Sequence, residues 1–264
     1  MLKSFALSSV VLAATLQAMS VSAANDPYEP YKQLFESLQG ASSAQAPLLL
    51  EKAYPGISKR LKAARPLSVT RWTESMNYDE LAKSEILPVS LLKALGIPYR
   101  EQDGRTIPSA GVMHTYGYLF SQLQTSFGKK GKRWLESRMD ERLGLPARMF
   151  SIDPPKGEFL ANVTRALDRN TLTSPYFGEH AGFQLGKRAE TWTILTYLTP
   201  LKPLEGQAET TLLSYGVKKG KGAQVMWVTV FPITADFEKS IRERDCQKAP
   251  GTFSPRFNLA LPKG

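Results

Sequence analysis

The sequence predicts an α+β fold in which a helical N-terminal half packs on a mostly antiparallel C-terminal sheet. In the first two thirds of the chain, apolar residues recur at the three- and four-residue spacing of helix faces. Residues 191–233 are instead rich in β-branched and aromatic side chains, interrupted by glycine-containing turns. Helices followed by strands, without an alternating βαβ order, are typical of α+β proteins. No long linker of Pro, Gly and Ser divides the chain, so we expect residues 25–264 to form a single globular domain.

Helices are predicted wherever apolar residues form one stripe. Tyr31, Leu34, Phe35 and Leu38 follow helical spacing, and Gly40 stands where this helix would end. The same reasoning predicts further helices at residues 47–53, 57–62, 88–95, 133–143, 156–168 and 238–245.

Strands are predicted at residues 67–72, 191–199, 210–217 and 224–233, with a further edge strand at residues 255–261. A lysine- and glycine-rich loop, residues 218–222, separates two of them, which is typical of an antiparallel hairpin. Nearly every residue of the 224–233 segment is apolar. We therefore expect this strand to be covered on both faces and to lie in the centre of the sheet.

The first 24 residues are expected to be a cleaved secretory signal peptide. Lys3 supplies a positive charge, residues 5–18 are uncharged and largely apolar, and residues 21–24 are small, as a cleavage site requires. The apolar run is shorter than the roughly 20 residues of a membrane-spanning helix. We therefore expect a soluble mature protein in the periplasm or outside the cell, without an integral membrane segment. The single cysteine, Cys246, excludes an intrachain disulfide.

The composition restricts the function to a few classes. The chain has 264 residues, 42% hydrophobic and 22% charged, which is the composition of a globular protein. Its formal net charge of +10 favours anionic partners such as phosphates, acidic glycans, nucleic acid or an anionic membrane surface, although the same charge can serve solubility alone. No phosphate-binding loop, dinucleotide fingerprint, HExxH, CxxC or GxSxG motif is present. With two histidines and one cysteine, no metal site or cofactor is expected.

The two histidines are the candidate catalytic residues, and whether the protein is an enzyme at all stays open. His114 lies in an aromatic run, whereas His180 follows Glu179 in a glycine-flanked stretch. If both imidazoles face one pocket, they can act as general acid and base on a phosphoester or a polysaccharide, with Glu179 orienting His180. The alternative is a hydrogen-bonded core histidine and an exposed loop histidine.

The leading hypothesis is a basic and aromatic ligand-binding surface at residues 111–134. Cations at residues 129–133 precede a predicted helix, where they oppose the helix dipole, and a bound anion would offset this repulsion. The expected ligand is a small anion or acidic polymer, with nucleic acid left open and a protein partner as the further alternative, in an interaction or inhibitor module of the cell envelope. The residues expected to bind are Tyr116, Tyr118, Lys129, Lys130, Lys132, Arg133 and Trp134.

Overall fold

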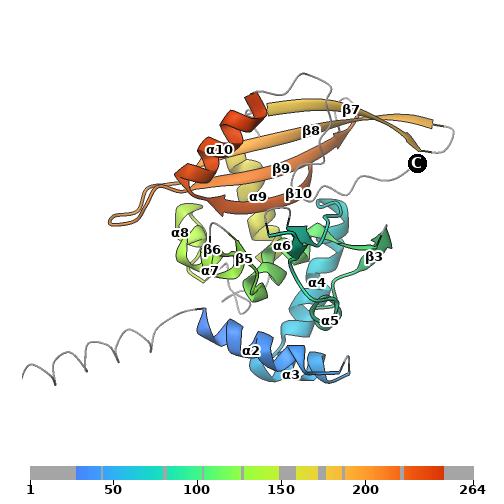
Figure 1. Ribbon diagram of the computed structural model, residues 1–264, viewed down its shortest axis with the longest axis vertical. Helices are drawn as coiled ribbons and strands as arrows, with labels where there is room; N and C mark the ends of the chain where they lie inside the picture. Colours follow the sequence, from blue (N-terminus) through green and yellow to red (C-terminus); the bar gives the residue numbers. More distant parts are fainter. Residues whose placement is uncertain are drawn as a thin grey trace, which may run out of the picture.

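A computed structural model of the protein describes residues 28–42, 44–79, 82–102, 104–125, 128–148, 159–171, 177–185, 188–220 and 223–246. An antiparallel sheet forms one end of the molecule and the N-terminal helices form the other (Figure 1). The α+β prediction is therefore confirmed. The expected signal peptide and the expected strand at residues 255–261 lie outside the described residues.

The chain begins with three helices, α2 (Glu29–Gln39), α3 (Gln45–Ala53) and α4 (Ile57–Thr70). α2 buries the apolar stripe that predicted it and ends at Gly40. The predicted strand at residues 67–72 is wrong, because α4 continues through Pro66 as far as Thr70. Tertiary packing outweighs the strand preference of the β-branched residues here, because Ser68 is buried and its hydroxyl lies 2.7 Å from that of Ser109.

Short elements fill the middle of the chain. α6 and the following 3-10 helix, η1, are completely buried, and they contain the aromatic run of the sequence. The helix predicted at residues 133–143 is split into α7 and α8, because Arg138 between them adopts a left-handed backbone with φ of +44°. The elements of this region are β1 (Tyr78–Asp79), β2 (Ser84–Glu85), α5 (Val89–Ala94), β3 (Tyr99–Gln102), β4 (Arg105–Pro108), α6 (Ala110–Thr115), η1 (Gly117–Phe120), β5 (Gln124–Thr125), β6 (Gly128–Lys129), α7 (Lys130–Glu136) and α8 (Met139–Arg142).

The main sheet follows α9 (Phe159–Thr171) and has the strand order β10-β9-β8-β7, with every pair antiparallel. Its strands are β7 (Phe177–Leu185), β8 (Arg188–Pro200), β9 (Thr211–Lys219) and β10 (Met226–Ile233), and α10 (Ala235–Cys246) ends the described chain. The predicted hairpin of β9 and β10 is confirmed.

β10 is buried along nearly its whole length, as predicted, but it lies at the edge of the sheet rather than in the centre. The backbone around Trp72 covers this edge. Trp227 donates its N–H to the Arg71 carbonyl at 2.9 Å, and its own carbonyl accepts from Thr73 N–H at 2.9 Å. A run of apolar residues thus predicts that a strand is buried, but it does not predict the strand's place in the sheet. A neighbouring loop can cover an edge strand as well as a second strand can.

One buried apolar cluster extends from the N-terminal helices to the sheet. Polar contacts tie its parts together around Asp168 of α9. This carboxylate pairs with Arg71 at 2.5 Å and accepts a hydrogen bond from Trp227 Nε1 at 3.1 Å. Within the described ranges, no helix has the length and apolar character needed to cross a bilayer.

Candidate functional site

His114 lies in α6 and is completely buried between this helix, η1 and β10. Its Nδ1 is 2.8 Å from the Ala110 carbonyl, so Nδ1 carries a proton and donates it to that oxygen. Nε2 is then an acceptor, and the hydroxyls of Thr229 and Tyr118 lie 2.5 Å and 3.1 Å from it. Both ring nitrogens are therefore used within the core.

The burial of His114 decides its protonation state. Desolvation, with a smaller contribution from the nearby Lys130 ammonium, lowers the His114 pKa from 6.5 to about 3, although the bond to Ala110 opposes this. The imidazole is therefore neutral near pH 7 and holds α6 against β10. This geometry corresponds to the alternative of a hydrogen-bonded core histidine.

We expect the free energy of unfolding to fall by about 1 kcal/mol when the pH drops from about 7 to about 5.5. In this range the folded protein keeps His114 neutral, whereas the unfolded chain binds a proton at its ordinary pKa of 6.5. Because the unfolded state binds more protons, acid favours unfolding. Urea unfolding at the two pH values measures the change. A His114→Gln variant should lose this pH dependence and a His180→Gln control should keep it; the opposite pattern would contradict the assignment.

His180 and Glu179 lie in β7, where His180 is paired with Thr193 of β8 and Glu179 with Ile194. β7 and β10 are the outer strands of the sheet, separated by β8 and β9. Because three strand spacings amount to about 14 Å and His114 contacts β10, the backbone does not bring the two histidines together. The proposed acid–base pair has no common site among the described residues.

The predicted cation cluster contains a buried ion pair. Lys130 and Asp79 are each 7% exposed, and the Lys130 ammonium lies 2.7 Å from the Asp79 carboxylate. The same ammonium lies over the rings of Tyr118 and Phe231, 5.2 Å and 5.5 Å from their centres. Burial lowers the pKa of Lys130, and Asp79 opposes this shift. The sequence pattern predicts a bound anion to offset the cations at the start of α7. The Asp79 carboxylate, which belongs to the chain itself, supplies this negative charge.

The remaining predicted binding residues do not form a common surface. Tyr116, Tyr118 and Trp134 are buried, with at most 2% of each exposed. The Lys129 ammonium donates a hydrogen bond to the Gln122 side-chain oxygen at 3.2 Å, and the Lys132 ammonium forms an ion pair with the Glu136 carboxylate at 3.5 Å.

Arg133 is half-buried beside this cluster. Two of its guanidinium nitrogens, Nε and Nη1, are buried without a hydrogen-bond partner among the described residues. Burial lowers the pKa of this arginine, whereas the nearby Asp79 raises it. Segment 111–134 is thus largely internal, and of the predicted binding residues Trp134 alone lines the hollow described next.

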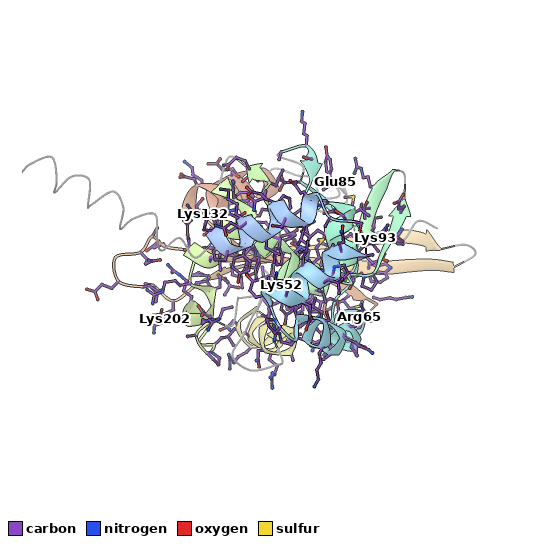
Figure 2. All side chains as sticks on the ribbon, turned by 90° about the horizontal axis from the view of Figure 1, so that it is seen from below. Lys52, Arg65, Glu85, Lys93, Lys132 and Lys202 are labelled. Atoms are coloured by element: carbon purple, nitrogen blue, oxygen red, sulfur yellow. The ribbon has the colours of Figure 1, made fainter. Side chains whose placement is uncertain are left out.

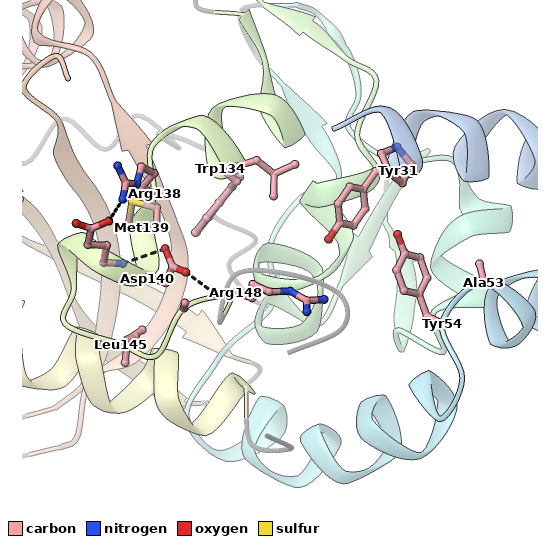
Figure 3. Close-up of a pocket in the computed structure, with 13 residues that line it drawn as sticks. Tyr31, Ala53, Tyr54, Trp134, Arg138, Met139, Asp140, Leu145 and Arg148 are labelled. Carbon is pink, nitrogen blue, oxygen red and sulfur yellow. Dashed lines mark hydrogen bonds and ion pairs between the residues drawn. The ribbon is translucent and has the colours of Figure 1, made fainter. Parts of the chain in front are cut away.

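A concave site lies between α2, the end of α3, α7 and α8 (Figure 3). This hollow, called the aromatic hollow below, has a volume of about 790 Å³, within the range of small-molecule sites. Tyr31 and Trp134 are nearly buried at its base, and the ring of Tyr54 stacks on Tyr31 with a centroid distance of 6.0 Å. The lining residues are Pro30, Tyr31, Ala53, Tyr54, Trp134, Leu135, Arg138, Met139, Asp140, Glu141, Leu145, Ala147 and Arg148.

Charged residues form one side of the aromatic hollow. Arg138 pairs with Glu141, so these two charges compensate each other. The Asp140 carboxylate accepts the backbone N–H groups of Glu141 at 2.9 Å and of Arg148 at 2.6 Å, and thereby fixes the turn that carries Arg148. Arg148 is exposed, and Figure 3 shows its side chain directed from this turn toward Tyr54 and Tyr31.

Both arginines have an unusual backbone. Arg138 and Arg148 adopt φ values of +44° and +63°, a region that non-glycine residues rarely occupy. Among the described residues, Lys83 is the other non-glycine example. Such backbone strain is often found at functional sites. It therefore supports a role for the two arginines of the aromatic hollow.

Comparisons with models of known protein families, with curated proteins and with solved structures find no match to this chain. Among the described residues, no group of three or more His, Cys, Asp or Glu side chains could hold a metal ion. The case for a functional site therefore depends on the geometry of the aromatic hollow alone.

Proposed function

We propose that this chain is an exported protein that binds a small organic anion in the aromatic hollow. The observation that carries the proposal is the exposed Arg148, directed toward Tyr54 and Tyr31 in a hollow that aromatic residues help to line. The partly exposed ring of Tyr54 offers a flat apolar face to a sugar or aromatic ring, and a guanidinium donates paired hydrogen bonds to a phosphate or carboxylate. The ligand classes that fit are phosphate monoesters and short acidic glycans.

The local charges are consistent with this ligand chemistry. The carboxylates of Asp140 and Glu141 are already engaged with backbone N–H groups and with Arg138. Arg148 adds a guanidinium to the same lining. The net charge of +10 for the whole chain also attracts anions from solution.

Calorimetric titration with phenyl phosphate and with a short uronic-acid oligosaccharide tests the proposal. We expect one of these probes to bind, and Arg148→Gln to weaken its binding at least about tenfold, because one charge-assisted contact is lost. Lys93→Gln, an exposed cation on α5, is the matched control and should bind normally. Arg148→Gly is a second variant, which keeps the left-handed backbone without strain. Unchanged affinity in both Arg148 variants would refute the proposal.

The predicted hydrolase and the envelope interaction module remain hypotheses. The hydrolase hypothesis has no common site for its two histidines, because His114 lies in α6 against β10 and His180 lies in β7 at the opposite edge of the sheet.

A further inference from the structure

A second charged surface, independent of the aromatic hollow, lies on α3, α4 and α5. Five exposed cations of this surface make no ion pair with any described carboxylate; they are Lys52, Lys59, Lys62, Arg65 and Lys93. Viewed from the end of the molecule that carries α2 and α3, Figure 2 shows Lys52 near the middle of this face, with Arg65 and Lys93 beside it. We call these three helices and their exposed cations the basic face.

Helix geometry explains why the cations point outward. On α3, Ala46 and Leu50 are buried, and Leu48 and Lys52 lie four residues apart on the opposite side. On α4, Ile57, Leu61 and Ser68 face the core, which leaves Lys62, Arg65 and Val69 on a shared outer face. The charges are therefore held by helices that are anchored on their other side.

The basic face also exposes apolar side chains. Leu48 is 71% exposed and Val69 67% exposed, and these are the large hydrophobic residues that stand out on the described surface. A shallow hollow of about 440 Å³ opens beside Leu48, lined by Ala41, Leu49 and Lys52 among others. An aliphatic side chain, an apolar depression and a lysine thus lie next to one another.

We propose that the basic face docks on the surface of an anionic lipid bilayer. The cations match negatively charged headgroups, whereas Leu48 and the depression beside it match the apolar layer below them. Single-stranded nucleic acid would favour aromatic side chains for stacking on its bases, and the exposed apolar residues here are aliphatic. Duplex DNA offers phosphates to the cations but no apolar layer for Leu48. The combination of charge and aliphatic surface therefore favours lipid over nucleic acid.

Sedimentation with lipid vesicles tests this surface. At low salt residues 25–264, the chain without its expected signal peptide, should bind vesicles of phosphatidylcholine that contain about 30% phosphatidylglycerol, and should not bind vesicles of phosphatidylcholine alone. The Lys52→Glu/Lys62→Glu variant should bind the anionic vesicles at least about 30-fold more weakly, because four units of charge are changed on the basic face. Leu48→Ser should also weaken binding, and this part of the loss should persist at high salt.

The matched control is Lys202→Glu/Lys239→Glu. It changes the net charge by the same amount at exposed positions in the loop after β8 and on α10, away from the basic face (Figures 1 and 2). The control should bind anionic vesicles as the original chain does. Three outcomes would overturn the proposal: no binding to anionic vesicles, equal losses in the two double variants, or tighter binding to duplex DNA than to the vesicles. The aromatic hollow plays no part in this test, so its failure leaves the proposed function unaffected.

Discussion

Replacing Asp79 with asparagine is expected to lower the free energy of unfolding by about 3 to 5 kcal/mol. Asp79 is the carboxylate that compensates the buried Lys130 ammonium at 2.7 Å, and each residue is only 7% exposed. The asparagine keeps the size of the side chain but leaves a cation in the core without its counter-charge. Chemical denaturation near pH 7 measures the loss.

The double variant Asp79→Asn/Lys130→Met separates the charge from the packing. Methionine has the length of the lysine stem but carries no charge, so it should recover most of the stability lost in Asp79→Asn. If Asp79→Asn costs less than about 1 kcal/mol, or if the double variant is no more stable than the single one, the pair is not a buried ionic contact in solution.

Gly131→Ala is expected to destabilise the protein by about 3 kcal/mol or to prevent folding. Gly131 lies in α7, where this helix crosses η1. An added Cβ would stand 2.5 Å from the Leu119 carbonyl oxygen, 2.9 Å from that of Tyr118 and 2.8 Å from the Tyr28 ring. Two of these contacts are with backbone, which cannot rotate away as a side chain can. Thermal unfolding and the yield of folded protein measure the effect.

Gly40→Ala is the matched control, because no atom lies within 4 Å of its added Cβ and its φ of −86° suits any residue. It should leave stability within about 0.5 kcal/mol of the original. If Gly131→Ala behaves in the same way, α7 and η1 do not approach as closely as described.

Much of the fold could be predicted from the sequence, because several of its long elements have regular patterns of apolar residues. The stripe of α2 and the apolar run of β10 each predicted burial, and burial is what the structure has there. The errors arose where contacts distant in sequence decide the outcome. Ser68 near the end of α4 packs against Ser109, and the edge of β10 is covered by residues around Trp72. Neither partner can be read from the local sequence.

The candidate site was only partly accessible, for a similar reason. Tyr31, Tyr54, Trp134 and Arg148 come from four separate segments, and each has an ordinary explanation in its own local pattern. His114 was a catalytic candidate because the chain has only two histidines. A rare residue type can equally occur in the core, where the structure places His114. The left-handed backbone of Arg138 and Arg148 is one observation in favour of the candidate site, and it is visible only in the structure.

The most direct test of this account compares one probe anion on two folded variants, Arg148→Gln and His180→Ala. With calorimetry on the probe that binds the original chain, we expect Arg148→Gln to lose at least about tenfold in affinity and His180→Ala to retain it. The opposite result, with binding lost in His180→Ala and kept in Arg148→Gln, would place the ligand at the sheet and contradict the aromatic hollow as the binding site.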